Sequence, residues 1–177
     1  ANYDFEPTDV VVMVNIGASI TNINVLRGDK SIFTRDFTLA GNTITEAIQS
    51  SYKLTFDDAE SMQIFGPNAD DAARDAFRES LLSYADPICT EIERSIDYFR
   101  STSGGDSIKK ILLSGGVAAI AGITGDLAQR LGIETEILDP FRKIQCNKRA
   151  LSSERINEIR TIAAVAVGLA LRKVGDK

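Results

Sequence analysis

The stretch Ile111-Leu112-Leu113-Ser114-Gly115-Gly116-Val117-Ala118 decides the fold of this 177-residue chain. The apolar residues predict a buried strand, the two glycines a tight turn, and the residues after them a helix over 117–131. Paired glycines let a ligand approach the backbone closely, and a helix N-terminus favours an anion such as phosphate. The turn is neither a Walker loop nor a GxGxxG fingerprint. Taken alone, it is more often an ordinary connection than a ligand site.

A second glycine turn lies near the N-terminus, in Val14-Asn15-Ile16-Gly17-Ala18-Ser19-Ile20-Thr21. An apolar run over 10–14 and the alternation over 19–27 predict two strands joined at Gly17, and a third strand follows a Gly-Asp turn. Consecutive N–H groups in such a hairpin turn can converge on an anion, and Ser19 and Thr21 add hydroxyl donors. A hairpin of this kind is, by itself, most often only structural.

The rest of the chain alternates helical patterns with short strands. Thr43 and Glu46, three residues apart, have the spacing of a capping box and predict the start of a helix with Thr43 as its N-cap. Thr55 opens a second helix, and Pro87 should interrupt a long third one. The predicted helices cover about 43–52, 55–66, 70–100 and a C-terminal stretch from 154 or 161 to 173, and strands cover 109–114 and 134–138. This order predicts an α/β fold whose mixed sheet starts with a three-strand meander and is flanked by helices.

The composition excludes several classes of protein. The chain has no histidine, which removes His-dependent triads and imidazole zinc sites. Lys and Arg number 20 against 25 Asp and Glu, and the net charge of -5 argues against nucleic acid as a partner. Cys89 and Cys146 form no CxxC pair, which predicts two reduced thiols. The longest apolar run, 162–171, is about half the length of a membrane span.

That apolar run places small residues on one helical face, with Ala164 and Gly168 four positions apart. Glycine inside a helix costs about 1 kcal/mol relative to alanine, so Gly168 suggests a close backbone contact. A helix packed in the core of its own domain would explain the run equally well. If this face is instead exposed, we expect the chain to self-associate through it.

Taken together and in this order, the hairpin, the strand-Gly-Gly-helix turn and the small-residue helix resemble the second half of the actin-like ATPase superfamily, which has a ribonuclease H-like fold. Further stretches resemble its PilM family of type IV pilus assembly proteins, which is similar to FtsA: Gly41-Asn42-Thr43-Ile44-Thr45-Glu46-Ala47-Ile48, Tyr52, Ala59-Glu60, Glu91-Ile92-Glu93-Arg94-Ser95-Ile96-Asp97-Tyr98-Phe99 and Asp139-Pro140-Phe141. The resemblance implies that residues 1–177 form the second lobe of a two-lobed protein. It places a core subdomain at 1–40 and 105–177, with a smaller helical and strand subdomain inserted at 41–104.

The resemblance also implies a site for ATP or ADP with Mg²⁺ between two lobes. The residues implied to contact the nucleotide are Gly17, Ala18, Ser19 and Thr21 at the terminal phosphates, Glu60 near the nucleoside, and Gly115, Gly116 and Val117 along the sugar, inner phosphate and base. Asn15 stands where an Asp usually holds magnesium through water, and Gln63 stands where relatives often carry Lys. Asn15 can still bond a metal-bound water but adds no charge, so magnesium binding and hydrolysis should be weakened.

The function implied by the resemblance is a nucleotide-binding scaffold in the type IV pilus assembly platform. Its expected partner is a PilN-like cytoplasmic peptide, docked mainly on the other half, and its expected location is cytoplasmic, peripheral to the inner membrane. We expect no catalytic residues and no competent ATPase in this chain, because phosphoryl transfer needs groups on both sides of the phosphate. An FtsA-like division protein and a sugar-kinase-like enzyme are the alternatives.

Overall fold

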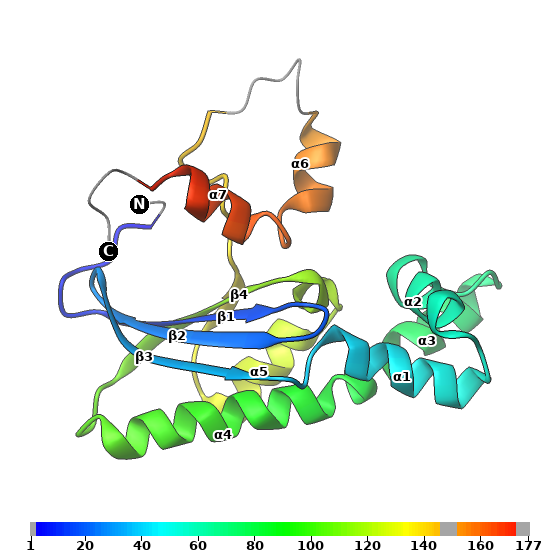
Figure 1. Ribbon diagram of the computed structural model, residues 1–177, viewed down its shortest axis with the longest axis horizontal. Helices are drawn as coiled ribbons and strands as arrows, with labels where there is room; N and C mark the ends of the chain where they lie inside the picture. The colour runs from blue at the N-terminus through cyan, green and yellow to red at the C-terminus, as the bar shows by residue number, and fades with distance from the viewer. Residues whose placement is uncertain (1–2, 146–151, 173–177) are drawn as a thin grey trace.

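The computed structural model describes residues 3–145 and 152–172, and its centre is a five-stranded mixed sheet (Figure 1). The strands are β1 (Val10–Ile16), β2 (Thr21–Arg27), β3 (Lys30–Phe37), β4 (Ile108–Ser114) and β5 (Thr135–Ile137). They lie in the order β3-β2-β1-β4-β5. The meander β1–β2–β3 is antiparallel, whereas β4 pairs in parallel with both β1 and β5. The predicted mixed sheet with its opening meander is therefore confirmed.

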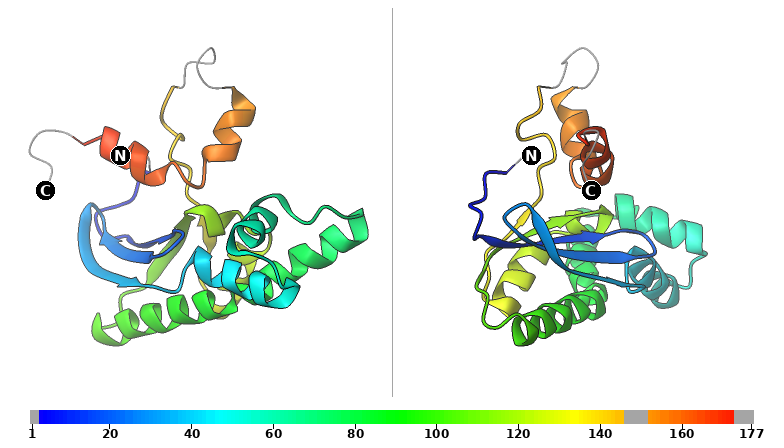
Figure 2. Two further views of the ribbon diagram at one scale, coloured as in Figure 1. Left: turned by 45° about the vertical axis from the view of Figure 1, so that its right-hand side comes forward. Right: turned by 60° about the vertical axis from the view of Figure 1, so that its left-hand side comes forward.

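Helices surround this sheet in three groups. The chain forms α1 (Gly41–Tyr52), α2 (Phe56–Phe65), α3 (Asp71–Tyr84), α4 (Asp86–Thr102), the 3-10 turn η1 (Gly116–Ala119), α5 (Ile123–Leu131), α6 (Ser153–Ile159) and α7 (Ala164–Ala170). Figures 1 and 2 show α4 and α5 on one face of the sheet, α6 and α7 on the opposite side, and α1–α3 beyond one end.

The main core lies between the sheet and α4 with α5. Val12 and Val14 of β1 point to the same face and are fully buried, as are Ile92 of α4 and Leu127 of α5. A second, smaller cluster on the other face contains Val11, Leu112 and Leu138, with Tyr3, Phe5, Met13 and Ala164 packed against it. Because β1 is buried on both faces, it reads as a continuous apolar run rather than as an alternating pattern.

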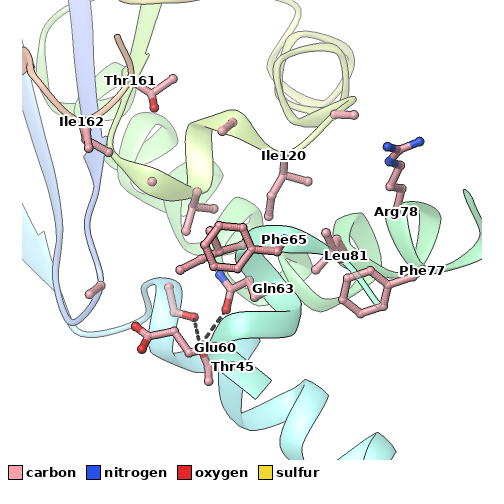
Figure 3. A pocket seen from close by; sticks show the side chains of 18 of the residues that line it. Thr45, Glu60, Gln63, Phe65, Phe77, Arg78, Leu81, Ile120, Thr161 and Ile162 are labelled. Carbon is pink, nitrogen blue, oxygen red and sulfur yellow. Dashed lines mark hydrogen bonds between the residues drawn. The ribbon is translucent and has the colours of Figure 1, made fainter. Parts of the chain in front are cut away.

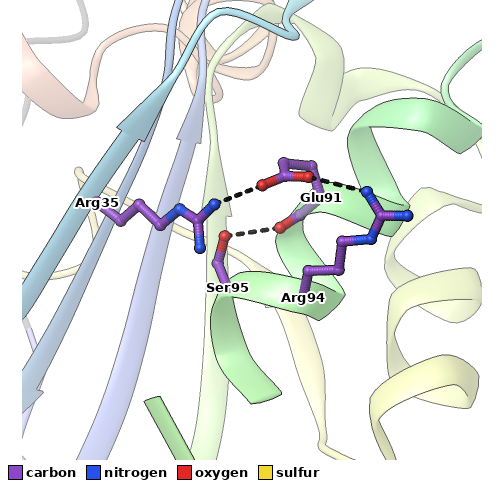
Figure 4. A network of polar contacts seen from close by, with 4 residues as sticks. All are labelled: Arg35, Glu91, Arg94 and Ser95. Atoms are coloured by element: carbon purple, nitrogen blue, oxygen red, sulfur yellow. Dashed lines mark hydrogen bonds and ion pairs between the residues drawn. The ribbon is translucent and has the colours of Figure 1, made fainter. Parts of the chain in front are cut away.

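A polar network ties the edge strand β3 to α4 (Figure 4). The guanidinium of Arg35 lies 2.7 Å from Oε1 of Glu91, whose other oxygen lies 3.5 Å from Arg94. The hydroxyl of Ser95, which is buried, donates to the main-chain carbonyl of Glu91 at 2.6 Å. Glu91 therefore holds β3 and the middle of α4 together at the border of the main core.

The edge strand β3 contains an irregularity. The register of β2 and β3 shifts where Val25 pairs with Phe33 and Leu26 pairs with Ser31. Ile32 therefore has no opposite residue on β2, which is the arrangement of a β-bulge.

Several predicted helix limits differ from the observed ones. The helix predicted over 117–131 is divided into η1 and α5, because Ile120 after η1 has an extended backbone and Gly122, with a φ of 88°, is the N-cap of α5. The predicted N-cap Thr43 is wrong: α1 begins two residues earlier, and Thr43 Oγ1 instead accepts from the N–H of the cap residue Ala40. The predicted C-terminal helix is two helices, α6 and α7, and its predicted end at residue 173 lies outside the described residues.

Pro87 interrupts the long helical pattern as predicted. The chain breaks at Ala85 into α3 and α4, and Pro87 lies in the first turn of α4. Residues in a first turn donate no hydrogen bond within the helix, so the missing N–H of proline costs nothing there. Residues 41–104 contain helices and no strand. Within this range α4 packs on the sheet and α1–α3 lie beyond its end, so the division into 1–40 with 105–177 and 41–104 stays a prediction.

The helix α7 does not lie in the core. Val165 and Leu169 are 57% and 62% exposed, so of the two alternatives the helix packed in the core is wrong. A Cβ built on Gly168 meets no atom within 4 Å, and the suggested close contact at this glycine is thus not made by the described part of the chain. None of the helices in the described ranges has the length and apolar character needed to cross a bilayer.

Candidate functional site

The two glycine turns lie side by side because β1 and β4 are adjacent parallel strands. Asn15 at the end of β1 is paired with Ser114 at the end of β4, so both strands turn at the same edge of the sheet. Gly115 follows with a φ of 94°, and a Cβ built on it would lie 2.1 Å from the carbonyl oxygen of Ile16. Only glycine allows this approach, which brings the hairpin turn and the second turn into contact.

The N-terminus of α1 closes over the hairpin turn. The N–H of Gly41 donates to the carbonyl of Gly17 at 2.9 Å, and that of Asn42 donates to the carbonyl of Ala18 at 2.7 Å. The side-chain amide of Asn42 also donates to Ser19 Oγ at 3.3 Å. These bonds use the first amides of α1 and hold the hairpin turn against the start of this helix.

A cavity of about 580 Å³ opens between these turns and the helices α2 and α3 (Figure 3). One wall comes from the two glycine turns and η1, and the other from α1, α2 and α3. Its lining residues include Gly17, Ala18, Gly41, Asn42, Thr45, Glu60, Gln63, Phe65, Arg74, Phe77, Arg78, Leu81, Gly116, Val117, Ile120, Glu158 and Thr161. The volume falls in the range typical of small-molecule sites.

The predicted nucleotide contacts fall into two groups in the structure. Gly17, Ala18, Glu60, Gly116 and Val117 all line the cavity, whereas Ser19, Thr21 and Gly115 do not. Thr21 is buried, and its hydroxyl donates to the carbonyl of Leu39 at 2.8 Å, which gives it a structural role. Ser19 is exposed and contacts Asn42, and Gly115 packs on Ile16.

The main chain of the two glycine turns lines one side of the cavity. Within the described ranges, the amides of Ala18, Gly116 and Val117 donate to no protein acceptor. A Cβ on Gly116 would meet no atom within 4 Å, so the space in front of this turn is open. Unpaired amides from two adjacent turns, beside the start of a helical turn, form a cradle that suits an anionic group such as phosphate.

The residues present do not fit a magnesium ion held by the protein itself. Asn15 does not line the cavity, and its Oδ1 accepts a hydrogen bond from the hydroxyl of Ser114 at 3.1 Å. Among residues 3–145 and 152–172, no group of three or more acidic, Cys or His side chains could hold a metal ion. Any divalent cation at this site would therefore have to be held mainly by the ligand.

The wall formed by α2 and α3 was not predicted from the sequence, apart from Glu60 and Gln63 on α2. Arg74 and Arg78 lie one helical turn apart on α3 and line the cavity, with Phe77 between them. Phe65, which ends α2, is 84% exposed and lies at the same cavity. The spacing of Arg74 and Arg78 could have placed both on one helix face, but no sequence signal shows that this face meets the glycine turns.

The two arginines differ in their partners. Arg78 lies 2.9 Å from Asp75 on the same helix, and both side chains are largely exposed, so this pair contributes little to stability. Nε of Arg74 donates to the carbonyl of Pro67 at 3.3 Å, and in the described structure Arg74 has no carboxylate partner. Its guanidinium is thus a positive charge available to a ligand or to solvent.

Comparison with known families identifies the chain's relatives. Residues 4–174 match the family model for the type IV pilus assembly protein PilM. The chain belongs to the PilM family. A chain of a solved PilM–PilN type IV pilus biogenesis complex is similar to it, with 30% identity, a TM-score of 0.79 and 97% of this chain covered. The alignment covers 48% of that PilM-family structure, so this chain spans about half its length.

More distant structures share the fold of this PilM-family chain. The ethanolamine utilization protein EutJ from Carboxydothermus hydrogenoformans has a TM-score of 0.63 at 18% identity, with 92% of this chain and 49% of EutJ covered. MreB5 of Spiroplasma citri bound to AMPPNP has a TM-score of 0.58 at 15% identity, with 94% of this chain and 53% of MreB5 covered. The fold is that of an actin-like α/β lobe, as the glycine turns and their order predicted.

Proposed function

We propose that this chain is the nucleotide-binding lobe of a scaffold protein in the type IV pilus assembly platform. One observation carries the proposal: in a member of the PilM family, two glycine turns with unpaired amides line a cavity whose far wall is α2 and α3. A cavity with unpaired amides at one end, and with both apolar and charged side chains along the rest of its wall, fits a nucleotide better than a sugar or a peptide.

The ligand we propose is ATP or ADP. The amides of Ala18, Gly116 and Val117 would hold phosphate oxygens, and Glu60 would accept a hydrogen bond from a ribose hydroxyl. Magnesium would enter with the phosphates, with Asn15 at most bonding a metal-bound water through its side-chain oxygen. A nucleotide analogue bound to MreB5, which has the same fold, supports this choice of ligand.

We further propose that the chain binds nucleotide without hydrolysing it. Phosphoryl transfer depends on charge placed around the phosphate, and the cradle contributes neutral amides beside a neutral Asn15. The test is phosphate release in excess Mg-ATP. Turnover that rises in proportion to the chain concentration and disappears in Gly116→Ala would contradict this part of the proposal.

The proposed partner is a PilN-like peptide, and the proposed place of action is the cytoplasmic side of the inner membrane. A solved complex of PilM with PilN, to which this chain is similar over 97% of its length, supports the partner. We place the main peptide contact outside this chain, in the half of the longer relative that it does not cover.

Nucleotide binding is tested by titrating ADP and ATP into the purified chain with calorimetry. We expect saturable binding that Gly116→Ala weakens at least tenfold, because the new methyl group fills the space in front of the amides without touching the protein. Gly125→Ala in α5 is the matched control, since its Cβ also meets no atom within 4 Å. Absence of saturable binding by the folded chain, or equal affinity in Gly116→Ala, would overturn the proposal.

A further inference from the structure

We infer that Thr45 is a positioning residue that fixes the side-chain amide of Gln63 with its NH₂ group toward the cavity, next to Glu60. The resulting pair of one donor and one acceptor selects ligands with a vicinal diol, and hence ribonucleotides over deoxyribonucleotides. This inference rests on the proposed nucleotide site and adds to it a basis for sugar specificity.

The contact between Thr45 and Gln63 joins α1 and α2 in the wall of the cavity (Figure 3). Thr45 on α1 is 2% exposed, and its Oγ1 lies 2.6 Å from Oε1 of Gln63 on α2. The second acceptor near this hydroxyl is the carbonyl of Gly41, at 3.4 Å. Because a threonine hydroxyl carries one proton, the short contact to Gln63 is the bond that it forms.

The length of this contact decides which way the amide points. A separation of 2.6 Å is usual for an O–H···O bond and is shorter than the normal range of an N–H···O bond. The reversed amide would place Nε2 at this distance and leave the hydroxyl only the distant carbonyl of Gly41. Thr45 therefore favours the orientation with Oε1 inward and both N–H donors of Gln63 free for the cavity.

Glu60 and Gln63 then present complementary groups from one face of α2. They are three residues apart on this helix and both line the cavity. The carboxylate of Glu60 only accepts hydrogen bonds, and the NH₂ group of Gln63, which lies opposite the oxygen held by Thr45, only donates them. A ribose diol supplies one hydroxyl that donates to Glu60 and one that accepts from Gln63. Loss of either hydroxyl leaves one protein group without its partner.

The experiment compares the affinities of ATP, 2′-deoxy-ATP and 3′-deoxy-ATP, with inorganic tripolyphosphate as a probe of the phosphate cradle alone. We expect the chain to prefer ATP about tenfold over either deoxy analogue. In Thr45→Val, which keeps the side-chain shape, the preference should fall to about twofold or less, while tripolyphosphate binding is unchanged. Thr45→Ser should restore the preference because it restores the hydroxyl.

Gln63→Met serves as a second variant that changes no buried hydroxyl, and it should lose the preference in the same way. A wild-type chain that binds ATP and both deoxy analogues equally, or a Thr45→Val or Gln63→Met chain that keeps the preference, would overturn the inference while leaving the nucleotide site intact. Failure of ATP to bind the folded wild-type chain would instead overturn the proposed function, and the inference with it.

Discussion

The main chain of Gly115 lies directly against that of Ile16, so close that a Cβ on Gly115 would be 2.1 Å from the Ile16 carbonyl oxygen. This contact joins the ends of β1 and β4 and sets the distance between the two glycine turns. The hairpin turn at Gly17 and the turn at Gly115, which we propose to hold the ligand's phosphates, are thus one unit that the sheet holds in place.

This contact predicts a sharp difference between two neighbouring glycines. Gly115→Ala should lower the free energy of unfolding by about 3 kcal/mol or more, because the methyl group collides with backbone and φ is positive. Gly116→Ala should change stability by less than about 1 kcal/mol, since its Cβ has open space. Urea unfolding followed by circular dichroism measures both. Equal stabilities of the two variants would show that the turns are not packed as described.

A second prediction concerns magnesium. Because Asn15 carries no charge and already accepts from Ser114, magnesium should change the affinity of the chain for ADP by no more than about threefold. Asn15→Asp keeps an acceptor for the Ser114 hydroxyl and adds a carboxylate, so it should make ADP binding depend more strongly on magnesium. Calorimetric titrations with Mg²⁺ and with a chelator decide the matter. An identical magnesium effect in both chains would remove Asn15 from any role at the metal.

A third prediction concerns the buried thiol of Cys89. Burial, with Asp126 beside it, raises the pKa of this thiol from 9.0 to about 12. The native chain therefore keeps the thiol protonated and unreactive, whereas the unfolded chain forms thiolate near pH 9. Because the thiol loses its proton more easily in the unfolded chain, its titration lowers the free energy of unfolding as the pH rises. The stability that the protonated Cys89 contributes is complete below pH 9 and is lost as the pH rises toward 12.

In a Cys146→Ser chain, which leaves Cys89 as its single thiol, Ellman's reagent at pH 8 should react only at the rate of unfolding. The same chain in urea, where Cys89 is exposed, is the control that gives the full rate. Fast labelling under native conditions would contradict the burial of this side chain. Cys146 itself lies outside the described residues.

A fourth prediction concerns the exposed apolar side of α7. Val165 and Leu169 are more than half exposed, so the purified chain should self-associate as its concentration rises. Replacing both by serine should shift sedimentation toward the monomer. Ile32→Thr, which removes another partly exposed apolar residue from the edge strand β3, should not. A clean monomer of the unmodified chain at high concentration would count against this surface.

The sequence predicted the sheet well because local pattern and burial agree there. The run over 10–14 belongs to a strand buried on both faces, and the alternation over 21–25 follows the inward side chains of β2. The same alternation could have shown that Thr21 points inward with Ile23 and Val25. Such a position favours its observed structural role over a ligand contact.

The rest could not be predicted because it depends on contacts between distant segments. The break between η1 and α5 depends on the extended backbone of Ile120 and on the positive φ of Gly122, and the local sequence shows neither. The far wall of the cavity requires α2 and α3 to fold back toward the glycine turns, and the sequence of α3 alone does not show this. Likewise, an apolar helix such as α7 has the same sequence pattern whether a partner covers it or it is exposed to solvent.

The bulge at Ile32 limits how this lobe can join other molecules. Strand addition needs a free edge whose donors and acceptors repeat regularly, and β3 loses that regularity where Ile32 has no opposite residue. The opposite edge strand, β5, has three residues and offers too short a template. The sheet is thereby guarded against edge-to-edge aggregation. A partner that binds this lobe must do so through side chains on helices and turns and not by extending the sheet.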